Sequence, residues 1–214
     1  MFKGTSASAG IGIGKAVIVE EAELVITRNE VADAEAEIQR FKGALEKTIA
    51  ATQKMADDLA SRVGEKEAEI MQGHMMLLSD PMLTGEIENS VKNDKVNCEF
   101  AIENVCNMYA DMFASMGDEL MQQRATDMRD IKVRMQRTLM GLESVDVSLL
   151  PKGSILVAKD LTPSMTAGIN PENVSGIVTE LGGKTSHSAI LARALEIPAV
   201  VAVNGLMDAV KDGD

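Results

Sequence analysis

Aromatic side chains are nearly absent from this chain of 214 residues, which has no Trp, one Tyr and four Phe. Fifteen methionines take over part of their volume. Methionine fills irregular gaps in a core and also makes adaptable contact surfaces. Most of the methionines are therefore expected in helix cores, and a Met-rich face is a hint of a docking site.

Basic residues are in the minority. Asp and Glu total 33 against 21 Lys and Arg, so the net charge is −12. Nucleic-acid binding needs basic patches that meet the phosphate backbone, and the charge argues against that function. The same charge suits a protein partner whose contact face is basic.

Long apolar runs and a disulfide framework are missing as well. No stretch has the apolar length of a membrane span, and the glycine-interrupted N-terminus does not read as a signal peptide. Cys98 and Cys106 lie on one helical stretch, where they do not read as a disulfide framework. A reducing cytoplasm and no contact with a membrane are therefore expected. With two His and no clustered Cys ligands, no metal site is expected.

The chain has three segments of different texture. Residues 1–22 read as a turn and a β-branched strand, and residues 145–214 alternate β-branched runs with Gly, Pro and one clear helix, an α/β pattern. Residues 23–144 have a helical composition. A lone strand needs a sheet to join, so we predict a discontinuous α/β domain (1–22 and 145–214) with a helical domain inserted at 23–144. Three independent segments are the alternative. The final turn suggests that the α/β domain is cut short at its C-terminal end.

The inserted region is predicted to be a four-helix bundle. The first helix shows an apolar stripe from Val31 to Leu59, with Asn29 as its N-cap. The second helix, about residues 65–78, is expected to break before Pro81 with Asp80 as the new cap. The third begins near Asn97. The apolar stripes of the last two helices are expected to be Phe100, Met108, Met112 and Phe113, and then Met121, Met128, Ile131, Met135 and Leu139.

The most informative stretch follows a predicted strand and opens a helix: Gly182-Gly-Lys-Thr-Ser-His-Ser-Ala-Ile-Leu-Ala-Arg193. Its two glycines allow a tight turn and close approach of a ligand to the backbone. Thr185 or Ser186 can cap the helix, which places His187 in the first turn. The positive end of the helix dipole disfavours a charged imidazole there and stabilises an attached anion.

A neutral imidazole that becomes a stabilised phosphoryl carrier is what covalent phosphoryl transfer requires. Hydroxyl groups of Thr185, Ser186 and Ser188 can donate hydrogen bonds to the transferred oxygens. The residues alone leave open a histidine that only caps a helix or satisfies a buried backbone group. A serine nucleophile lacks its G-x-S-x-G elbow. The glycines of residues 10–14 lack P-loop spacing and precede a strand, so they are interpreted as a turn.

Residues 182–193 closely resemble the phosphohistidine signature of phosphoenolpyruvate-utilising enzymes, with the phosphorylated histidine at His187. Four further segments resemble one branch of that family, Enzyme I of the bacterial sugar phosphotransferase system: residues 8–14, 73–78, 124–131 and 160–164. The swivelling domain of a pyruvate phosphate dikinase or phosphoenolpyruvate synthase is the alternative, although dikinases lack the helical insert. A non-enzymatic docking module with a structural histidine is a third hypothesis.

This resemblance implies a phosphoryl relay. A C-terminal barrel, absent here, would bind phosphoenolpyruvate and Mg²⁺ and phosphorylate His187 at Nε2, and His187 would then phosphorylate the carrier protein HPr. Thr166 matches a threonine that hydrogen-bonds the active histidine. Lys184 and Met165 stand where the family commonly has Arg and Glu, so Lys184 keeps a charge without a bidentate grip. The residues expected to stabilise the phosphoryl group are Thr166, Gly182, Gly183, Lys184, Thr185, Ser186 and Ser188.

The resemblance also implies that HPr docks on the helical domain. The matching positions are Glu67, His74, Met76, Leu77, Met82, Leu83 and Arg124. Bundle core is the alternative for Met76, Leu77 and Leu83, a surface salt bridge for Arg124, and a plain surface histidine for His74. Arg193 is expected either to fold back towards the phosphate or to pair with Glu196. The full-length enzyme is expected to be a homodimer through its C-terminal domain, and this fragment a monomer.

Overall fold

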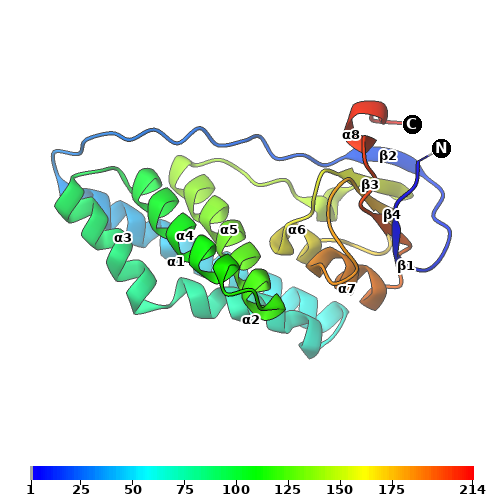
Figure 1. The fold of residues 1–214 in the computed structure, drawn as a ribbon, viewed down its shortest axis with the longest axis horizontal. Helices are drawn as coiled ribbons and strands as arrows, with labels where there is room; N and C mark the ends of the chain where they lie inside the picture. Colours follow the sequence, from blue (N-terminus) through cyan, green and yellow to red (C-terminus); the bar gives the residue numbers. More distant parts are fainter. Residues whose placement is uncertain (1) are drawn as a thin grey trace. The chain divides into compact units, whose positions relative to one another are not determined.

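The computed structural model describes residues 2–214 (Figure 1). Its contacts divide the chain into two compact units. The α/β unit contains the residues up to Ala22, then Asp58–Ala68 and Val145–Asp214, and the helical unit contains Glu23–Asp57 and Glu69–Ser144. Within the described part of the chain, no helix is both long and apolar enough to cross a membrane.

A five-stranded sheet forms the centre of the α/β unit, in the order β1-β5-β4-β3-β2. The strands are β1 (Thr5–Ser8), β2 (Lys15–Ile18), β3 (Ser154–Ala158), β4 (Val174–Thr179) and β5 (Ala199–Val201). Strands β2 to β5 are parallel neighbours, and β1 is antiparallel to β5. Strand β2 pairs with β3 in register from Lys15 opposite Ser154 to Ile18 opposite Val157. The prediction that the N-terminal strand joins a sheet built from the far end of the chain is confirmed.

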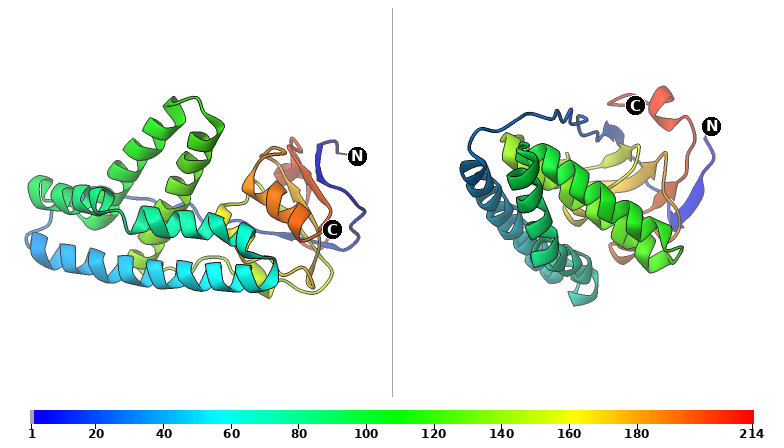
Figure 2. Two further views of the ribbon diagram at one scale, coloured as in Figure 1. Left: turned by 90° about the horizontal axis from the view of Figure 1, so that it is seen from below. Right: turned by 60° about the vertical axis from the view of Figure 1, so that its left-hand side comes forward.

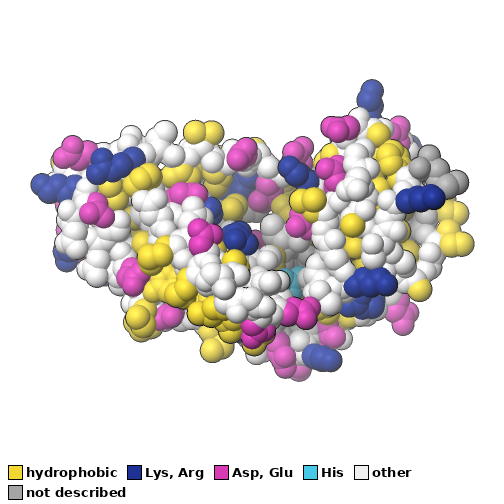
Figure 3. Space-filling view, in the orientation of Figure 1, with side chains coloured by type: hydrophobic (Ala, Val, Ile, Leu, Met, Phe, Trp, Pro, Cys, Tyr) yellow, Lys and Arg dark blue, Asp and Glu magenta, His cyan; other side chains and the backbone are white. Residues whose placement is uncertain are grey.

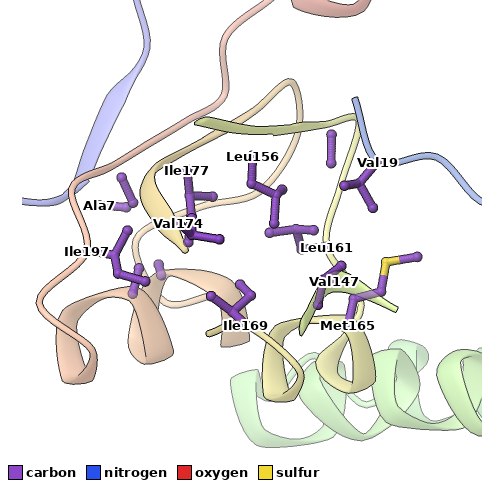
Figure 4. Close-up of a cluster of buried hydrophobic side chains, with 14 of the residues drawn as sticks. Ala7, Val19, Val147, Leu156, Leu161, Met165, Ile169, Val174, Ile177 and Ile197 are labelled. Carbon is purple, nitrogen blue, oxygen red and sulfur yellow. The ribbon is translucent and has the colours of Figure 1, made fainter. Parts of the chain in front are cut away.

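Two short helices, α6 (Pro163–Ala167) and α7 (His187–Ala194), lie on one face of this sheet (Figure 4). The alternating inward residues of the parallel strands pack against them. The residues of this core include Ala7, Leu156, Leu161, Met165, Ile169, Ile177, Ala189 and Ala192. On the other side, α8 (Leu206–Ala209) contributes Leu206 to a smaller cluster with Ala16, Val157 and Val203. This core therefore holds α6 and α7 together on the same face of the sheet.

The inserted region contains α1 (Ala34–Arg62), α2 (Glu65–Leu78), α3 (Pro81–Asp94), α4 (Cys98–Ser115) and α5 (Glu119–Met140) (Figure 2). These helices form the helical unit, except for the end of α1 and the start of α2 (residues 58–68), which belong to the α/β unit. Helices α2 and α3 are the two halves of the predicted broken helix, and the break is where Asp80 and Pro81 indicated it. The Asp80 carboxylate accepts a hydrogen bond from the Met82 N–H, and Pro81 is the first residue of α3. The predicted fold class, an α/β domain plus a helical bundle, is confirmed.

The start of α1 differs from the prediction. The helix begins at Ala34, and the Asp33 carboxylate accepts a hydrogen bond from the Ala36 N–H. Asn29 is not a cap, because its backbone N–H donates to the Asn97 side chain and its carbonyl accepts from the Asn97 N–H. Val31 therefore lies outside the helix, whereas Ala34 packs against the bundle core and the stripe residues Ile38, Phe41, Thr48, Thr52 and Leu59 are buried as expected.

The predicted stripe of α4 is partly right, because Phe100 and Phe113 pack against the bundle core, and wrong for its two methionines. Met108 and Met112 are exposed, and small residues form the buried face instead, including Ala101, Val105 and Ala110. Small side chains let α4 approach its neighbour α5 closely, so the methionines are left on the outer face. Cys98 and Cys106 lie on the buried face as free thiols, in agreement with the prediction that they form no disulfide.

Candidate functional site

His187 is the first residue of α7, and Ser186 is the N-cap. The Ser186 hydroxyl accepts a hydrogen bond from the Ala189 N–H at 3.3 Å, which settles the choice between Thr185 and Ser186 as the cap. The histidine side chain is half-buried at this position. The first backbone N–H groups of a helix have no partner within the helix and point along its axis, so this end of α7 suits an anion.

The glycine loop leads from β4 into this cap. Gly182 has φ +99°, a left-handed conformation that residues with a side chain rarely adopt. Ser186 closes the loop, because its N–H and its hydroxyl both lie within hydrogen-bond distance of the Gly183 carbonyl, at 3.1 and 2.9 Å. The hydroxyl groups of Ser186 and Ser188 are 2.9 Å apart. The predicted phosphoryl-stabilising residues from Gly182 to Ser188 therefore form one continuous loop around the N-terminus of α7.

Asp160 follows β3 and lies next to the glycine loop. A side chain built at Gly182 would bring its Cβ within 3.8 Å of the Asp160 Oδ1 atom. Burial raises the pKa of the Asp160 carboxyl, and a hydrogen bond from the Leu161 N–H opposes this effect. A carboxyl that resists ionisation repels a neighbouring anion less than an ordinary aspartate does.

Thr166 lies on α6, which packs against α7. Thr162 caps α6 by accepting a hydrogen bond from the Met165 N–H, and its carbonyl accepts a 2.7 Å hydrogen bond from the Thr166 hydroxyl. Thr166 is buried. Its proposed hydrogen bond to the imidazole of His187 remains a prediction.

The Arg193 side chain folds back to the glycine loop and does not pair with Glu196. Its Nη1 atom donates to the backbone carbonyls of Ala7 and Lys184, each at 3.0 Å. The guanidinium thereby ties the glycine loop to strand β1. Lys184 itself is exposed, so its ammonium group is accessible at the rim of the loop.

Arg62, in the last turn of α1, is a residue that the sequence analysis missed. Its guanidinium donates to the carbonyls of Ala167 and Ile169, at 2.7 and 2.8 Å. These carbonyls lie at and just beyond the C-terminal end of α6, where a cation is favourable. An arginine at the end of a long helix has many possible partners, and no sequence pattern indicates this one.

The positions predicted to meet HPr divide into two groups. Met76 is 73% exposed, Met82 is 66% exposed, and the Arg124 side chain is 34% exposed. Glu67 and Leu77 are half-buried. Leu83 is 2% exposed and packs in the bundle core, so the alternative interpretation is correct for this residue.

His74 is fully buried, which corrects the prediction that it lies at the surface. Its Nε2 atom lies 3.2 Å from the Asp127 Oδ1 atom, and its Nδ1 atom lies 3.6 Å from Asp130 Oδ2. A histidine beside an apolar run gives no sequence signal of this kind, because both carboxylates come from α5.

A larger exposed apolar surface accompanies Met76 and Met82. Figure 3 shows hydrophobic side chains gathered on one face of the helical unit, over α2, α3 and α4. Met108, Met112 and Met116 are four residues apart, a spacing that places side chains on one helix face, so the sequence did contain a signal for a shared methionine face. Exposed large hydrophobic residues that the sequence analysis did not assign to docking include Met108, Met112, Met116 and Leu120.

Two family models match the chain. One, the N-terminal region of PEP-utilising enzymes, covers residues 3–124, and the other, their mobile domain, covers residues 150–214. The chain belongs to the PEP-utilising enzymes. The family resemblance read from the glycine loop and the helical insert is confirmed.

Within the PEP-utilising enzymes, relatives called phosphoenolpyruvate-protein phosphotransferase match the whole chain. The one from Bacillus subtilis strain 168 is 41% identical over 99% of this chain, and the one from Listeria monocytogenes is 42% identical over 100%. Each match covers 37% of the relative, so the chain spans little more than a third of the length of these relatives.

Solved structures lead to the same branch of the PEP-utilising enzymes. A solution structure of Enzyme I (nEIt) is 40% identical, with a TM-score of 0.85, and the match covers 100% of this chain and 87% of that one. An N-terminal domain of Enzyme 1 - Nitrogen is 26% identical, with a TM-score of 0.64, over 94% of this chain and 83% of that one. Both matches include the helical unit, which supports Enzyme I over the dikinase alternative.

Proposed function

We propose that this chain is the phosphoryl-carrying N-terminal part of a phosphoenolpyruvate-protein phosphotransferase. His187 takes a phosphoryl group that originates on phosphoenolpyruvate and passes it to HPr, which begins the sugar phosphotransferase cascade. The observation that carries the proposal is the position of His187 at the N-terminus of α7, directly after a glycine loop. The name shared by the full-length relatives supports the reaction.

Two transfers make up the proposed reaction. In the first, the Nε2 lone pair of His187 attacks phosphorus, the N–P bond forms, and the bond from phosphorus to the enol oxygen breaks. The enolate takes up a proton and leaves as pyruvate. In the second, the N–P bond to His187 breaks as a histidine nitrogen of HPr attacks the same phosphorus. Each bond that forms replaces one that breaks, and solvent supplies the proton that the enolate takes up.

The residues around His187 have separate proposed roles. The first-turn N–H groups of α7 and the Ser188 hydroxyl donate to the phosphoryl oxygens, whereas Ser186 contributes as the cap of α7, because its own hydroxyl proton goes to the Gly183 carbonyl. The Lys184 ammonium offsets part of the negative charge. The Thr166 hydroxyl donates its own proton to the Thr162 carbonyl, so it accepts a hydrogen bond from the Nδ1–H group, which leaves the lone pair on Nε2 as the nucleophile. Thr185 and the two glycines shape the loop that brings the backbone close to the phosphoryl group.

HPr is proposed to dock on the exposed apolar face of the helical unit. Met76, Met82 and Leu77 are the docking residues retained from the sequence analysis, with Glu67 and Arg124 as polar contacts. We propose that exposed residues on or next to α4 and α5 extend this face: Met108, Met112, Met116 and Leu120. Flexible methionine side chains suit an apolar partner face, and the acidic chain suits basic residues around it.

The remaining steps belong to the part of the relatives that this chain does not span. Among residues 2–214 no group of three or more His, Cys, Asp or Glu side chains is placed to hold a metal ion. As the family resemblance implies, we place the Mg²⁺ and phosphoenolpyruvate sites, and the homodimer contact, in the region that the relatives have beyond this chain. The fragment is proposed to be a cytoplasmic monomer.

The identity of the phosphoryl donor tests whether the phosphoenolpyruvate site lies outside this chain. The chain is incubated with phospho-HPr, or with phosphoenolpyruvate and Mg²⁺, and its intact mass is measured. We expect a gain of one phosphoryl group from phospho-HPr and none from phosphoenolpyruvate. Efficient labelling by phosphoenolpyruvate alone would show that the donor site lies within this chain, contrary to the proposal.

A further inference from the structure

A buried polar network connects α2 to α5 beneath the proposed docking face. His74 on α2 is fully buried, and the Asp127 side chain on α5 is nearly so. A carboxylate can only accept hydrogen bonds, so the His74 Nε2 atom donates to Asp127 Oδ1, 3.2 Å away. The other oxygen of Asp127, Oδ2, lies 3.5 Å from the Arg124 Nη1 atom. One buried carboxylate therefore lies between a buried histidine and a partly exposed arginine.

Arg124 is also held from the α2 side. A Cβ atom built at Gly73 would lie 2.5 Å from Arg124 Nη1 and 3.5 Å from its Cζ atom, so the guanidinium rests on the bare backbone of α2. A side chain at this position has to displace the guanidinium. Gly73 and Met76 are three residues apart and share a helix face. The cation is thus fixed at the edge of the exposed apolar surface.

The far side of His74 is closed by further charged groups. Its Nδ1 atom lies 3.6 Å from Asp130 Oδ2, beyond hydrogen-bond length. The carboxylate of Asp130 interacts electrostatically with Arg134, whose Nη2 atom donates a 2.6 Å hydrogen bond to Thr52 on α1. The imidazole of His74 therefore lies between two carboxylates of α5, and it cannot turn towards a docking partner without losing its hydrogen bond to Asp127.

We propose that His74 is a positioning residue for docking. Through Asp127 it holds Arg124 in a single orientation over Gly73, and Arg124 in turn offers its outward N–H groups to a hydrogen-bond acceptor on the partner. Arginine loses much rotamer freedom when it is fixed by a partner, so an arginine that is fixed beforehand binds more tightly. The inference rests on the proposed function for the identity of the partner, HPr, but the ordering of Arg124 is a property of the free chain.

The matched variants are His74→Gln and His74→Leu. Glutamine can present an amide N–H near the place of Nε2, whereas leucine fills a similar volume without a donor. Gly73→Ala tests the same arginine from the other side and removes no charge and no hydrogen-bonding group. Arg129, an exposed arginine on α5, is an internal control in every sample.

The first measurement is the ¹⁵N heteronuclear NOE of the arginine Nε–Hε groups in the free chain. We expect Arg124 to be more ordered than Arg129 in the wild type and in His74→Gln, and to lose this order in His74→Leu and Gly73→Ala while Arg129 is unchanged. Equal mobility of Arg124 and Arg129 in the wild type overturns the proposal. So does an ordered Arg124 in a folded His74→Leu variant.

The second measurement is a titration with HPr. His74→Leu and Gly73→Ala are expected to raise Kd about tenfold, which corresponds to about 1.4 kcal/mol. His74→Gln is expected to stay near the wild type, and adding Arg124→Gln to Gly73→Ala is expected to cause little further loss. An unchanged Kd despite a disordered Arg124 overturns the docking role. If wild-type protein does not bind HPr, the proposed function fails, and the NOE data still decide whether His74 orders Arg124.

Discussion

The cap of α7 offers a way to separate local stability from electrostatics at His187. Ser186 accepts a hydrogen bond from the Ala189 N–H and precedes the histidine directly. Asn, Asp and Ser cap helices about equally well, whereas Ala costs about 1 kcal/mol. Ser186→Asn and Ser186→Asp therefore differ in one negative charge at almost constant helix stability, and Ser186→Ala measures the cap alone.

The expected magnitude follows from the charge on the phosphohistidine. Two like unit charges roughly 6 Å apart repel by about 3 kcal/mol at an effective dielectric constant of about 20. A phosphoryl group carries more than one negative charge near neutral pH, so the repulsion between it and the new aspartate should be at least about 3 kcal/mol. Ser186→Asp should then lower the equilibrium level of phosphohistidine on the order of a hundredfold. Ser186→Asn should stay within a few-fold of the wild type.

The assay combines urea unfolding with the extent of phosphorylation at equilibrium with a fixed ratio of phospho-HPr to HPr. We expect the Asn and Asp variants to unfold at similar urea concentrations and to differ strongly in phosphorylation. A higher salt concentration should reduce the difference in phosphorylation between the Asn and Asp variants, because the site is partly open to solvent and salt screens the repulsion. Equal phosphorylation of the two folded variants would refute the reasoning that the end of α7 holds the phosphoryl anion.

Three other results are expected. Arg62→Ala should lower the free energy of unfolding of the α/β unit by about 1–2 kcal/mol, since two partly exposed hydrogen bonds to carbonyls at the end of α6 are lost, and urea unfolding checks this. Leu83→Ala should lower the free energy of unfolding by about 2–5 kcal/mol, because it leaves a cavity in the bundle core. Met82→Ala, at the neighbouring exposed position, should change the free energy of unfolding by no more than about 0.5 kcal/mol and should weaken HPr binding in a titration. Burial raises the pKa of Cys98 and of Cys106 to about 12, so neither thiol should react with iodoacetamide at pH 8 until urea is added. The folded chain then binds more protons than the unfolded chain above the ordinary thiol pKa of 9, so stability should fall as pH rises from about 9 to 12.

Local chemistry made some of the structure predictable. Asp80 and Pro81 determine the break between α2 and α3 by themselves, and the two glycines with Ser186 determine the turn and cap before His187. The resemblance in residues 182–193 then supplied the family, because its residue types and spacing are specific.

The features that the sequence did not reveal depend on contacts between distant segments. Asn29 is a residue type that often caps helices, but it pairs with Asn97. Met108 follows a helical period but is exposed, and small residues such as Ala101 and Ala110 form the buried face of α4 instead. Arg62 and Arg193 bind backbone carbonyls, which have no sequence signature. His74 is buried by carboxylates that come from another helix.

The role of His187 is best tested by the intact mass of the chain after exchange with phospho-HPr, in the wild type and in His187→Ala. We expect a gain of one phosphoryl group in the wild type that is labile in acid and stable in base, and no gain in the folded variant. Phosphorylation that persists in His187→Ala, or a folded wild type that takes up none, would contradict the assignment of His187 as the phosphoryl carrier.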